Sequence, residues 1–168
     1  AVLRYLVEVG GAEQLQLENK NGSRPIHLAA GQNPNVDVLR CLVEVGGAEQ
    51  LQLELKDGKR PIHSAAWQNP NVDVLRCLVE VGGAEQLQLE DKDGRRPMHL
   101  VAQRLGRDQD VQAEAALQYL VEAGGSVHLS VKDDRGSFVI HYAVEYGSIE
   151  LLRCLVEVGG AEQLQLED

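Results

Sequence analysis

The stretch V-L-R-C-L-V-E-V-G-G-A-E-Q-L-Q-L-E runs from Val38 to Glu54 and returns unchanged from Val74 to Glu90. Two further copies, each differing at one position, run from Val2 to Glu18 and from Leu151 to Glu167. Four copies in a chain of 168 residues indicate an array of small structural units that stack on one another. Because such arrays expose extended binding surfaces, the stretch predicts a fold class and also a class of function.

The composition favours a helical core and disfavours two classes of partner. Apolar residues make up 43% of the chain but aromatic residues only 4%, which indicates short packed helices built from Leu, Val and Ala. The formal net charge of −10 argues against nucleic acid and acidic membrane surfaces, because both need clustered Lys and Arg. No apolar run approaches the ~20 residues of a membrane-spanning helix. We therefore expect neither nucleic acid nor a membrane as a partner.

The three cysteines occupy one position in three copies of the repeat: Cys41, Cys77 and Cys154. Equivalent residues of stacked helices lie about 8–10 Å apart, whereas a disulfide needs a Cα separation of roughly 4.4–6.8 Å. We therefore expect three free thiols. Free, buried cysteines suit a reducing compartment, so the expected localisation is cytoplasmic or nuclear.

The spacing of the histidines gives the length of the units. Thirty-six residues separate His27 from His63 and His63 from His99, and 42 separate His99 from His141. The third full unit therefore carries six extra residues, expected as a lengthened helix or a loop at one edge of the array. The predicted units are a partial repeat at 1–18, which holds only a second helix and a linker, and full repeats at 19–54, 55–90, 91–132 and 133–168, with the insertion at about 105–114.

Each full unit is expected to contain a turn, a first helix, a short link and a second helix. The turns end in Gly, as in Asn19–Gly22, because the chain there needs a positive φ. The first helix opens with Pro25, Pro61 or Pro97, where the missing N–H does no harm. Asp37 near the start of a second helix interacts favourably with the helix dipole, and a doubled glycine ends that helix.

After the doubled glycine, the segment A-E-Q-L-Q-L-E alternates polar and apolar residues, which is the period of an extended strand with one buried face. Leu51 and Leu53 are expected to point inward, and Gln50 and Gln52 outward. The linker after the third full unit follows the same pattern, with Leu129 and Val131 expected inward and His128 outward.

Three hexapeptides open the first helices: R-P-I-H-L-A (Arg24–Ala29), R-P-I-H-S-A (Arg60–Ala65) and R-P-M-H-L-V (Arg96–Val101). They resemble the T-P-L-H-x-A signature of the ankyrin repeat, and the resemblance covers the whole chain in constant register. It implies an all-α solenoid of stacked helix-turn-helix units with short turn or hairpin fingers, acting as a non-catalytic protein-interaction scaffold. Arg stands where the family has Thr, so we expect the His ring to take over the turn-pinning role of the Thr hydroxyl.

The repeated His27, His63, His99 and His141 also raise the alternatives of a metal ladder and of general bases. Zinc ligands must converge on one ion at about 2.0–2.1 Å, but equivalent residues of stacked units lie a full repeat apart. A Cys-His pair such as His63 and Cys77 recurs in several units, whereas an enzyme needs one site. The sequence holds no phosphate-binding loop and no zinc spacing. We expect no metal, no cofactor and no catalysis, and histidines that bond to turn backbone.

The resemblance implies that a protein or peptide partner docks on the turn tips and on the exposed side of the first helices. Much of the chain's positive charge is expected on this face, and Trp67 stands there in place of Gly31 and Gln103. Because Trp and Arg dominate binding hot spots, we expect an acidic partner to bind across units two to four. The predicted contact residues are Lys56, Asp57, Lys59, Trp67, Gln68, Lys92, Asp93, Arg95, Gln103, Arg104, Arg135 and Tyr146. Further positions on this face are Lys20, Asn21, Ser23, Gln32, Asp134, Ser137 and Glu145.

The second helices are expected to carry the opposite charge on their outer side. Their exposed acidic residues, each near an Arg of its own helix, are Glu44, Glu80, Glu122 and Glu157.

The two ends of the chain raise a second class of function. The chain opens with the second helix of a unit and stops at Asp168, which aligns with Asp91 at the opening of a further unit. One interpretation is a piece of a longer array that acts as a structural spacer between other domains. The other is head-to-tail self-association through the end faces.

Overall fold

The computed structural model describes residues 10–69, 71–105 and 111–160. The regular structure in these ranges is entirely helical. The helix expected at the very start of the chain, the residues of the insertion at 106–110 and Asp168 lie outside the described residues. The α-helices are α2 (Pro25–Gln32), α3 (Val36–Gly46), α4 (Pro61–Gln68), α5 (Val72–Gly82), α6 (Pro97–Arg104), α7 (Val111–Gly124), α8 (Val139–Tyr146) and α9 (Ile149–Gly159), and the 3-10 helices are η1 (Ala12–Gln16), η2 (Ala48–Gln52), η3 (Ala84–Gln88) and η4 (Ser126–His128).

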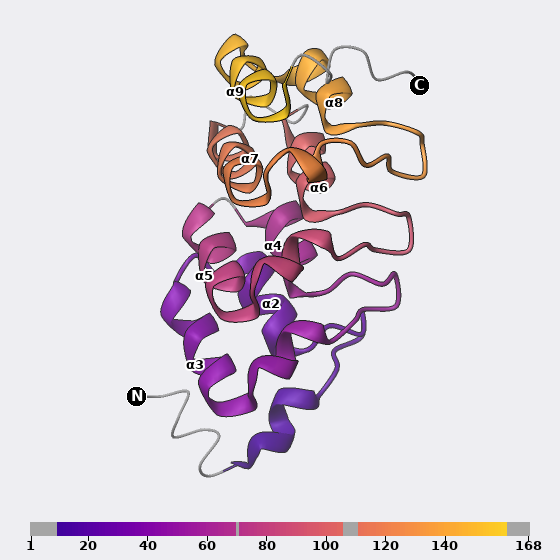
Figure 1. Cartoon of the computed structure of the whole chain (residues 1–168). Coiled ribbons are helices and arrows are strands. Elements are labelled where there is room, and N and C mark those ends of the chain that lie inside the picture. Colours follow the sequence, from indigo (N-terminus) through magenta and orange to yellow (C-terminus); the bar gives the residue numbers. More distant parts are fainter. Residues whose placement is uncertain (1–9, 70, 106–110, 161–168) are drawn as a thin grey trace. The chain divides into compact units, whose positions relative to one another are not determined.

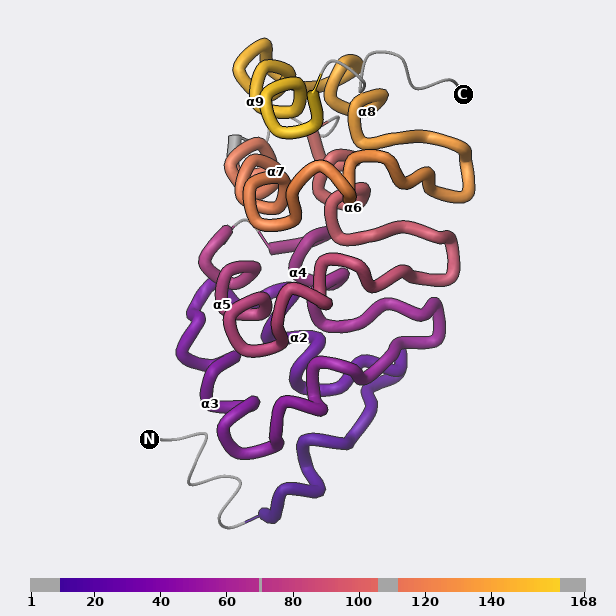
Figure 2. Tube along the Cα trace, viewed as in Figure 1, coloured from indigo at the N-terminus to yellow at the C-terminus, as the bar shows by residue number. Residues whose placement is uncertain are grey.

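The chain forms two compact units, Ala1–Gln86 and Leu87–Asp168. In the first unit, α2 pairs with α3 and α4 with α5, and the two pairs stack first helix on first helix and second helix on second helix (Figure 1). In the second unit, α6 and α7 stack on α8 and α9 in the same way. Within each unit, the turns that precede the first helices project as loops away from the second helices (Figure 2). The predicted all-α repeat fold is confirmed.

The first helices are short, and proline fixes the start of three of them. Pro25, Pro61 and Pro97 occupy the first helical position, as predicted, and each helix has eight residues. In α2, Ile26 and Ala30 are fully buried, and the small residues allow α4 to approach closely. Burial of these apolar faces supplies most of the stabilisation, since helices of this length are marginal on their own.

The second helices are positioned by caps and by an apolar stripe. The Oδ1 atom of Asn35 accepts a hydrogen bond from the Asp37 N–H at 2.9 Å and caps α3, and Asn71 does the same for α5. Leu39 and Leu42 form the buried stripe of α3. The helix ends before Gly47, whose φ of 84° is costly for any residue with a Cβ.

Side chains of the second Asn-Pro-Asn link form hydrogen bonds with the backbone of the preceding repeat. The Nδ2 group of Asn69 donates to the carbonyls of Ala30 and Asn33, at 2.8 and 2.9 Å. The Nδ2 group of Asn71 donates to the carbonyl of Pro34 at 2.8 Å. The second link therefore satisfies backbone acceptors of α2 and of the first link, which fixes the register of these two repeats.

The four linkers that the structure describes after doubled glycines contain 3-10 helices, so the extended conformation expected for them is wrong. Leu51 is buried as expected, but Gln50 is also buried and Leu53 is half-buried. The reason lies in Gly46: a Cβ placed there would come within 2.9 Å of the Gln50 Cγ, so glycine leaves the room in which this side chain packs. The Gln50 Nε2 then donates to the Gly46 carbonyl at 3.4 Å.

His128 packs on Gly124 as Gln50 packs on Gly46, so the prediction that His128 points outward is wrong. This side chain is buried, not outward, and its Cδ2 atom lies 2.8 Å from the place of a Cβ on Gly124. Leu129 is buried as expected, and Val131 is half-buried. In the four described linkers, the first glycine of the doubled pair thus receives the side chain four residues later, a contact that an alternating pattern cannot reveal.

The third full repeat differs from its neighbours in its second helix. Helix α7 has 14 residues, whereas α3, α5 and α9 have 11 each. Part of the expected insertion therefore lengthens a helix.

The glycine–glutamine contact generates a stability prediction. A Cβ on Gly82 would lie 2.7 Å from the Cγ and 2.8 Å from the Cδ of Gln86, and the buried Gln86 amide has no hydrogen-bond partner among the described residues. Gly82→Ala should lower the free energy of unfolding by about 1–3 kcal/mol through overpacking. The measurement is urea unfolding. In a Gln86→Ala background the same substitution should be neutral or stabilising, and equal losses in both backgrounds would contradict this contact.

Candidate partner-binding groove

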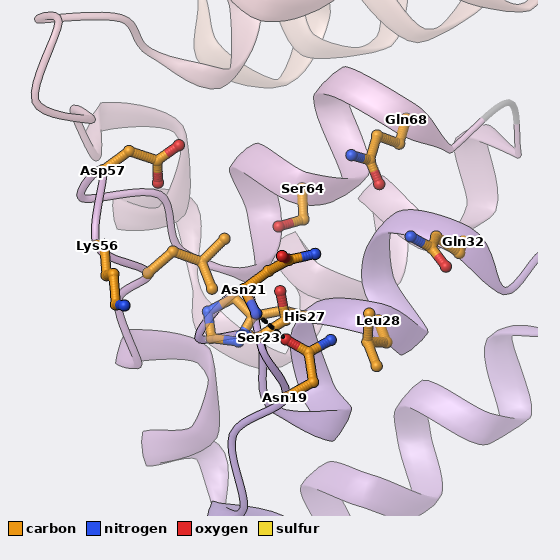
Figure 3. Close-up of a pocket in the computed structure, with 11 residues that line it drawn as sticks. Asn19, Asn21, Ser23, His27, Leu28, Gln32, Lys56, Asp57, Ser64 and Gln68 are labelled. Carbon is orange, nitrogen blue, oxygen red and sulfur yellow. Dashed lines mark hydrogen bonds between the residues drawn. The ribbon is translucent and has the colours of Figure 1, made fainter.

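A concave hollow in the first unit lies between two successive turns and the first helices α2 and α4. Its volume is about 640 Å³. Figure 3 shows side chains of both turns and both helices around this space. The lining residues are Asn19, Asn21, Ser23, His27, Leu28, Gln32, Leu55, Lys56, Asp57, Ser64 and Gln68.

The turns that form one wall are held by their own side chains. The Oδ1 atom of Asn19 accepts from the backbone N–H groups of Asn21 and Ser23, at 2.9 and 3.0 Å. The backbone of Asn19 also pairs with Ser23 and Gly22, and Gly22 has a φ of 78°. The groove therefore has a rigid wall before any ligand arrives, which lowers the entropy cost of binding.

The repeated histidines fix the turns to the helices, as predicted. The Nδ1 atom of His27 accepts from the Arg24 N–H at 3.4 Å, and that of His99 accepts from the Arg96 N–H at 3.2 Å. The opposite nitrogen, Nε2, donates to a linker carbonyl at 2.9 Å in both cases, Leu53 for His27 and Val131 for His99. Burial lowers the pKa of both rings, so they stay neutral at pH 7 with both nitrogens engaged.

The Arg that replaces the family's Thr has a recurring partner. Arg24 forms an ion pair with Glu18 at 2.9 Å, and Arg96 pairs with Glu90 at 3.0 Å. Arg60 pairs with Glu54 in the same way. These half-exposed ion pairs each contribute at most about 1 kcal/mol, but they hold the ends of these three linkers against the start of the next first helix.

The expected concentration of positive charge on the turn tips is reduced by local pairing. Lys59 Nζ lies 2.6 Å from the Oδ2 atom of Asp57. Arg95 is bound by the fully buried carboxylate of Asp91 at 3.0 Å and also by Asp93. These cations therefore stabilise their own turns. The guanidinium of Arg95 is already paired with two carboxylates of its turn, so its main role is structural.

The formal charge of the turns also differs between the two units. In the first unit, Lys20 gives its turn a charge of +1, and Lys56 and Lys59 with Asp57 give the next turn +1. In the second unit, the turn at 91–95 has two acidic and two basic residues and is neutral, and the turn at 133–137 carries two Asp against one Arg. Net positive turns are thus a property of the first unit.

In the second unit, a tyrosine fills the place that corresponds to the groove floor. Tyr142 of α8 takes the position that Ser64 of α4 has in the groove of the first unit, and it is buried. Its hydroxyl donates to Asp133 Oδ2 at 2.7 Å and accepts from Gln103 Nε2 at 3.2 Å. Burial and the Asp133 carboxylate raise the pKa of Tyr142, so this bridge persists across the physiological range.

The structure places the predicted contact residues in several different environments. Lys56, Asp57 and Gln68 line the groove of the first unit. Arg104, expected to be exposed, is only 4% exposed. Lys92, Asp93, Arg135 and Tyr146 are exposed residues of the second unit.

Trp67 is a residue of α4 at the position that Gly31 has in α2 and Gln103 has in α6. It is half-buried. Its equivalent Gly31 faces Ser64 and Gln68 of the following first helix, and its equivalent Gln103 contacts Tyr142. Trp67 is therefore only partly exposed, and its role as a contact residue stays a prediction.

Leu28 and Ser64 are groove residues that the sequence analysis did not select. Leu28 is 38% exposed and lies one helical turn before Gln32. Helical spacing from Gln32 and Gln68 back to these two residues is the signal that could have identified them.

The outer faces of the second helices pair between repeats. Arg40 in α3 contacts Glu80 in α5 at 3.0 Å, and Glu80 is exposed on the outer side as predicted. Both side chains are more than half exposed, and the pair contributes little to stability.

A family model described as ankyrin repeats (3 copies) matches residues 1–88. The chain is an ankyrin-repeat protein. The match agrees with the His-pinned turns and the stacked helix pairs, and the predicted family is confirmed. No curated protein sequence matches this ankyrin-repeat chain in the comparison. Among the described residues, no helix is long and apolar enough to cross a membrane.

The buried histidines generate a prediction on pH. Burial lowers the folded-state pKa of His27, His99 and His128 below the unfolded value of 6.5. The unfolded chain therefore binds more protons as the pH falls below about 6.5, and the free energy of unfolding should decrease in that range. Urea unfolding at pH 7.5, 6.5 and 5.5 measures this decrease.

The control for this experiment is His128→Gln, since Gln14, Gln50 and Gln86 occupy the same place in other linkers. This variant removes one titrating group and should show a smaller decrease between pH 7.5 and 5.5. Stability that is constant over this range in the unmodified chain would contradict the prediction.

Proposed function

We propose that the protein is a non-catalytic interaction module whose first-unit groove binds an extended, acidic segment of a partner protein. Ankyrin repeats are generally protein-interaction modules, and this family membership supports the general role. The observation that carries the specific proposal is the hollow between two net-positive turns and the α2–α4 face. In the second unit Tyr142 occupies the corresponding floor position.

The chemistry of the groove indicates the kind of segment that fits. Lys56 is exposed at the turn that forms one edge, and Lys20 is exposed on the preceding turn. Leu28 supplies an apolar contact, while Gln32 and Gln68 supply side-chain amides. Amides donate to and accept from peptide backbone, so an extended segment with a carboxylate near Lys56 and an apolar side chain over Leu28 complements the lining.

The negative net charge of the chain opposes the binding of an acidic partner at long range. A net charge of −10 repels an acidic partner at long range. Attraction therefore depends on the local lysines, acts within a Debye length of about 8–10 Å, and makes short-range complementarity the source of specificity.

The engagement of the histidines supports a non-catalytic role. His27 lines the groove beside Ser64 and Asp57, a composition that superficially resembles a nucleophile with a base. However, its Nδ1 accepts from Arg24 and its Nε2 donates to Leu53, so neither nitrogen is available to accept a proton from Ser64.

The thiols support placement in a reducing compartment, the cytoplasm or the nucleus. Cys41, Cys77 and Cys154 are all free. Burial raises the pKa of Cys77 and of Cys154, which keeps these thiols protonated and unreactive. Their role is packing at equivalent positions of the second helices.

The test is selection of short random peptides against the immobilised chain, followed by affinity measurement of the enriched peptides. We expect enrichment of Asp and Glu together with one apolar residue. Lys56→Glu should weaken binding about tenfold or more, because it replaces an attraction with a repulsion.

The matched control is Lys92→Glu, which makes the same change at the equivalent turn position of the second unit. It should leave the affinity unchanged. Equal loss in both variants would show a general charge effect, and selection of apolar or basic peptides would contradict the assignment of the groove. Failure to enrich any peptide would favour a structural spacer.

A further inference from the structure

Asn21 differs from the other asparagines of the chain in the residue that follows it. The asparagines are Asn19, Asn21, Asn33, Asn35, Asn69 and Asn71, and the residues after them are Lys, Gly, Pro, Val, Pro and Val, in that order. The backbone nitrogen of the following residue can attack an asparagine side chain. Proline has no N–H there, and a β-branched valine crowds the nitrogen. Glycine has no Cβ and leaves it accessible, so the sequence distinguishes Asn21.

The structure distinguishes the same residue by its free side chain. The side chains of the other five asparagines each accept a hydrogen bond from at least one backbone N–H group. The side chain of Asn21 forms no hydrogen bond with the residues that the structure describes, and Asn21 is exposed. Its amide is therefore accessible to attack and to water.

The turn that contains Asn21 restrains the attacking nitrogen. The Gly22 N–H donates to the Asn19 carbonyl at 2.9 Å, and the Oδ1 atom of Asn19 accepts from the backbone N–H of Asn21 at 2.9 Å. The Gly22 nitrogen must leave its hydrogen bond before it attacks, so the reaction needs a local opening of the turn. The stability of the turn therefore controls the rate, and Asn19 is the residue that sets this stability.

The reaction is a hydrolysis that needs water as its only co-reactant. The Gly22 nitrogen loses its proton to solvent and forms a bond to the Cγ atom of Asn21, and the side-chain nitrogen leaves as ammonia. Water then opens the resulting cyclic imide at one of its two carbonyls. One opening gives aspartate, and the other gives isoaspartate, which adds a methylene group to the backbone. In total, an amide and water become a carboxylate and ammonium.

The new carboxylate lies at the edge of the groove and lacks the partner that its equivalents have. Asn21 is one of the side chains that line the groove in Figure 3. Its equivalents in the next two turns are Asp57 and Asp93, and each is paired with a cation two residues later. In the first turn that later residue is Ser23. The charge of this turn, which is +1 from Lys20, therefore falls to zero.

We propose that Asn21 is a site of spontaneous deamidation, and that the modification converts the groove to a form with lower affinity for acidic segments. The effect on affinity rests on the proposed function of the groove, whereas the assignment of the site does not. The amide at this position keeps the first turn net positive, and its loss removes that charge from one edge of the groove.

The first test is incubation of the full chain at pH 7.5 for up to several weeks, followed by mass spectrometry of its proteolytic peptides. The mass increase that accompanies conversion of an amide to an acid should appear at Asn21 before it appears at any other asparagine. Asn19→Leu should accelerate it about fivefold, the equilibrium effect of one net hydrogen bond. Leu55 occupies this position in the next turn, which has the same backbone pairing, so the variant should fold. An earlier reaction at another asparagine, or no acceleration in a folded Asn19→Leu chain, would overturn the assignment.

The second test measures the consequence for the groove. The probe is a short fluorescent peptide of Glu with one central Leu, and the measurement is its anisotropy with the fresh chain, the incubated chain and Asn21→Asp. Both modified forms should bind at least about threefold more weakly, the effect of one added charge about 6 Å away in water. The matched control is Asn35→Asp, which makes the same change at an exposed helix cap outside the groove, where Asp also serves as a cap. It should bind like the fresh chain.

The outcomes separate the effect on affinity from the assignment of the site. Equal affinity of the fresh chain and Asn21→Asp, or an equal loss in Asn35→Asp, would overturn the effect on the groove. A fresh chain that does not bind the peptide would contradict the proposed function and the effect on affinity together. The assignment of Asn21 as the site is decided by the mass measurement alone.

Discussion

The turns of the first and third full repeats depend on the buried, neutral imidazoles of His27 and His99. In the repeats of His27 and His99, the ring accepts a hydrogen bond from the residue before the first helix and donates one to a linker carbonyl far along the chain, at Leu53 and Val131. Three segments therefore meet at a single side chain: the end of the turn, the start of the first helix and the linker to the next repeat. Because one nitrogen must accept and the other must donate, the ring has to be neutral and in one tautomer. Burial lowers the pKa and maintains that state.

Different residues build the repeat array and give it specificity. The second helices and linkers repeat almost unchanged, because they supply the buried stripe, the caps and the glycine–glutamine contact. The turns and first helices vary, and the two units differ most there. Lys56 and Leu28 contribute to an open groove in the first unit, whereas Tyr142 bridges Asp133 and Gln103 in the second. Recognition and stacking thus use different faces of the same helices.

The sequence predicted the helices, the role of proline at the first helical position and the bonding of the histidines, because each follows from a local rule that repeats. It failed where a side chain packs on a neighbouring segment. Gln50 is polar and follows an alternating pattern, yet it is buried because Gly46 leaves room for it. Arg104 is charged, yet it is buried. The positive charge of Lys59 and Arg95 is compensated by aspartates of their own turns, which a count of lysines and arginines does not show. The candidate groove was thus predicted as a region, but its floor and its charge balance required the structure.

The most direct test of this account is the protonation state of the ring nitrogens of His27 and His99, observed by long-range proton–nitrogen NMR correlation during a pH titration. The account predicts the Nε2–H tautomer for both rings, with an unprotonated Nδ1, and titration below the unfolded-state pKa of 6.5. Rings that exchange between tautomers and titrate near 6.5 would contradict it, since the turn, the helix start and the linker would then not be joined through these side chains.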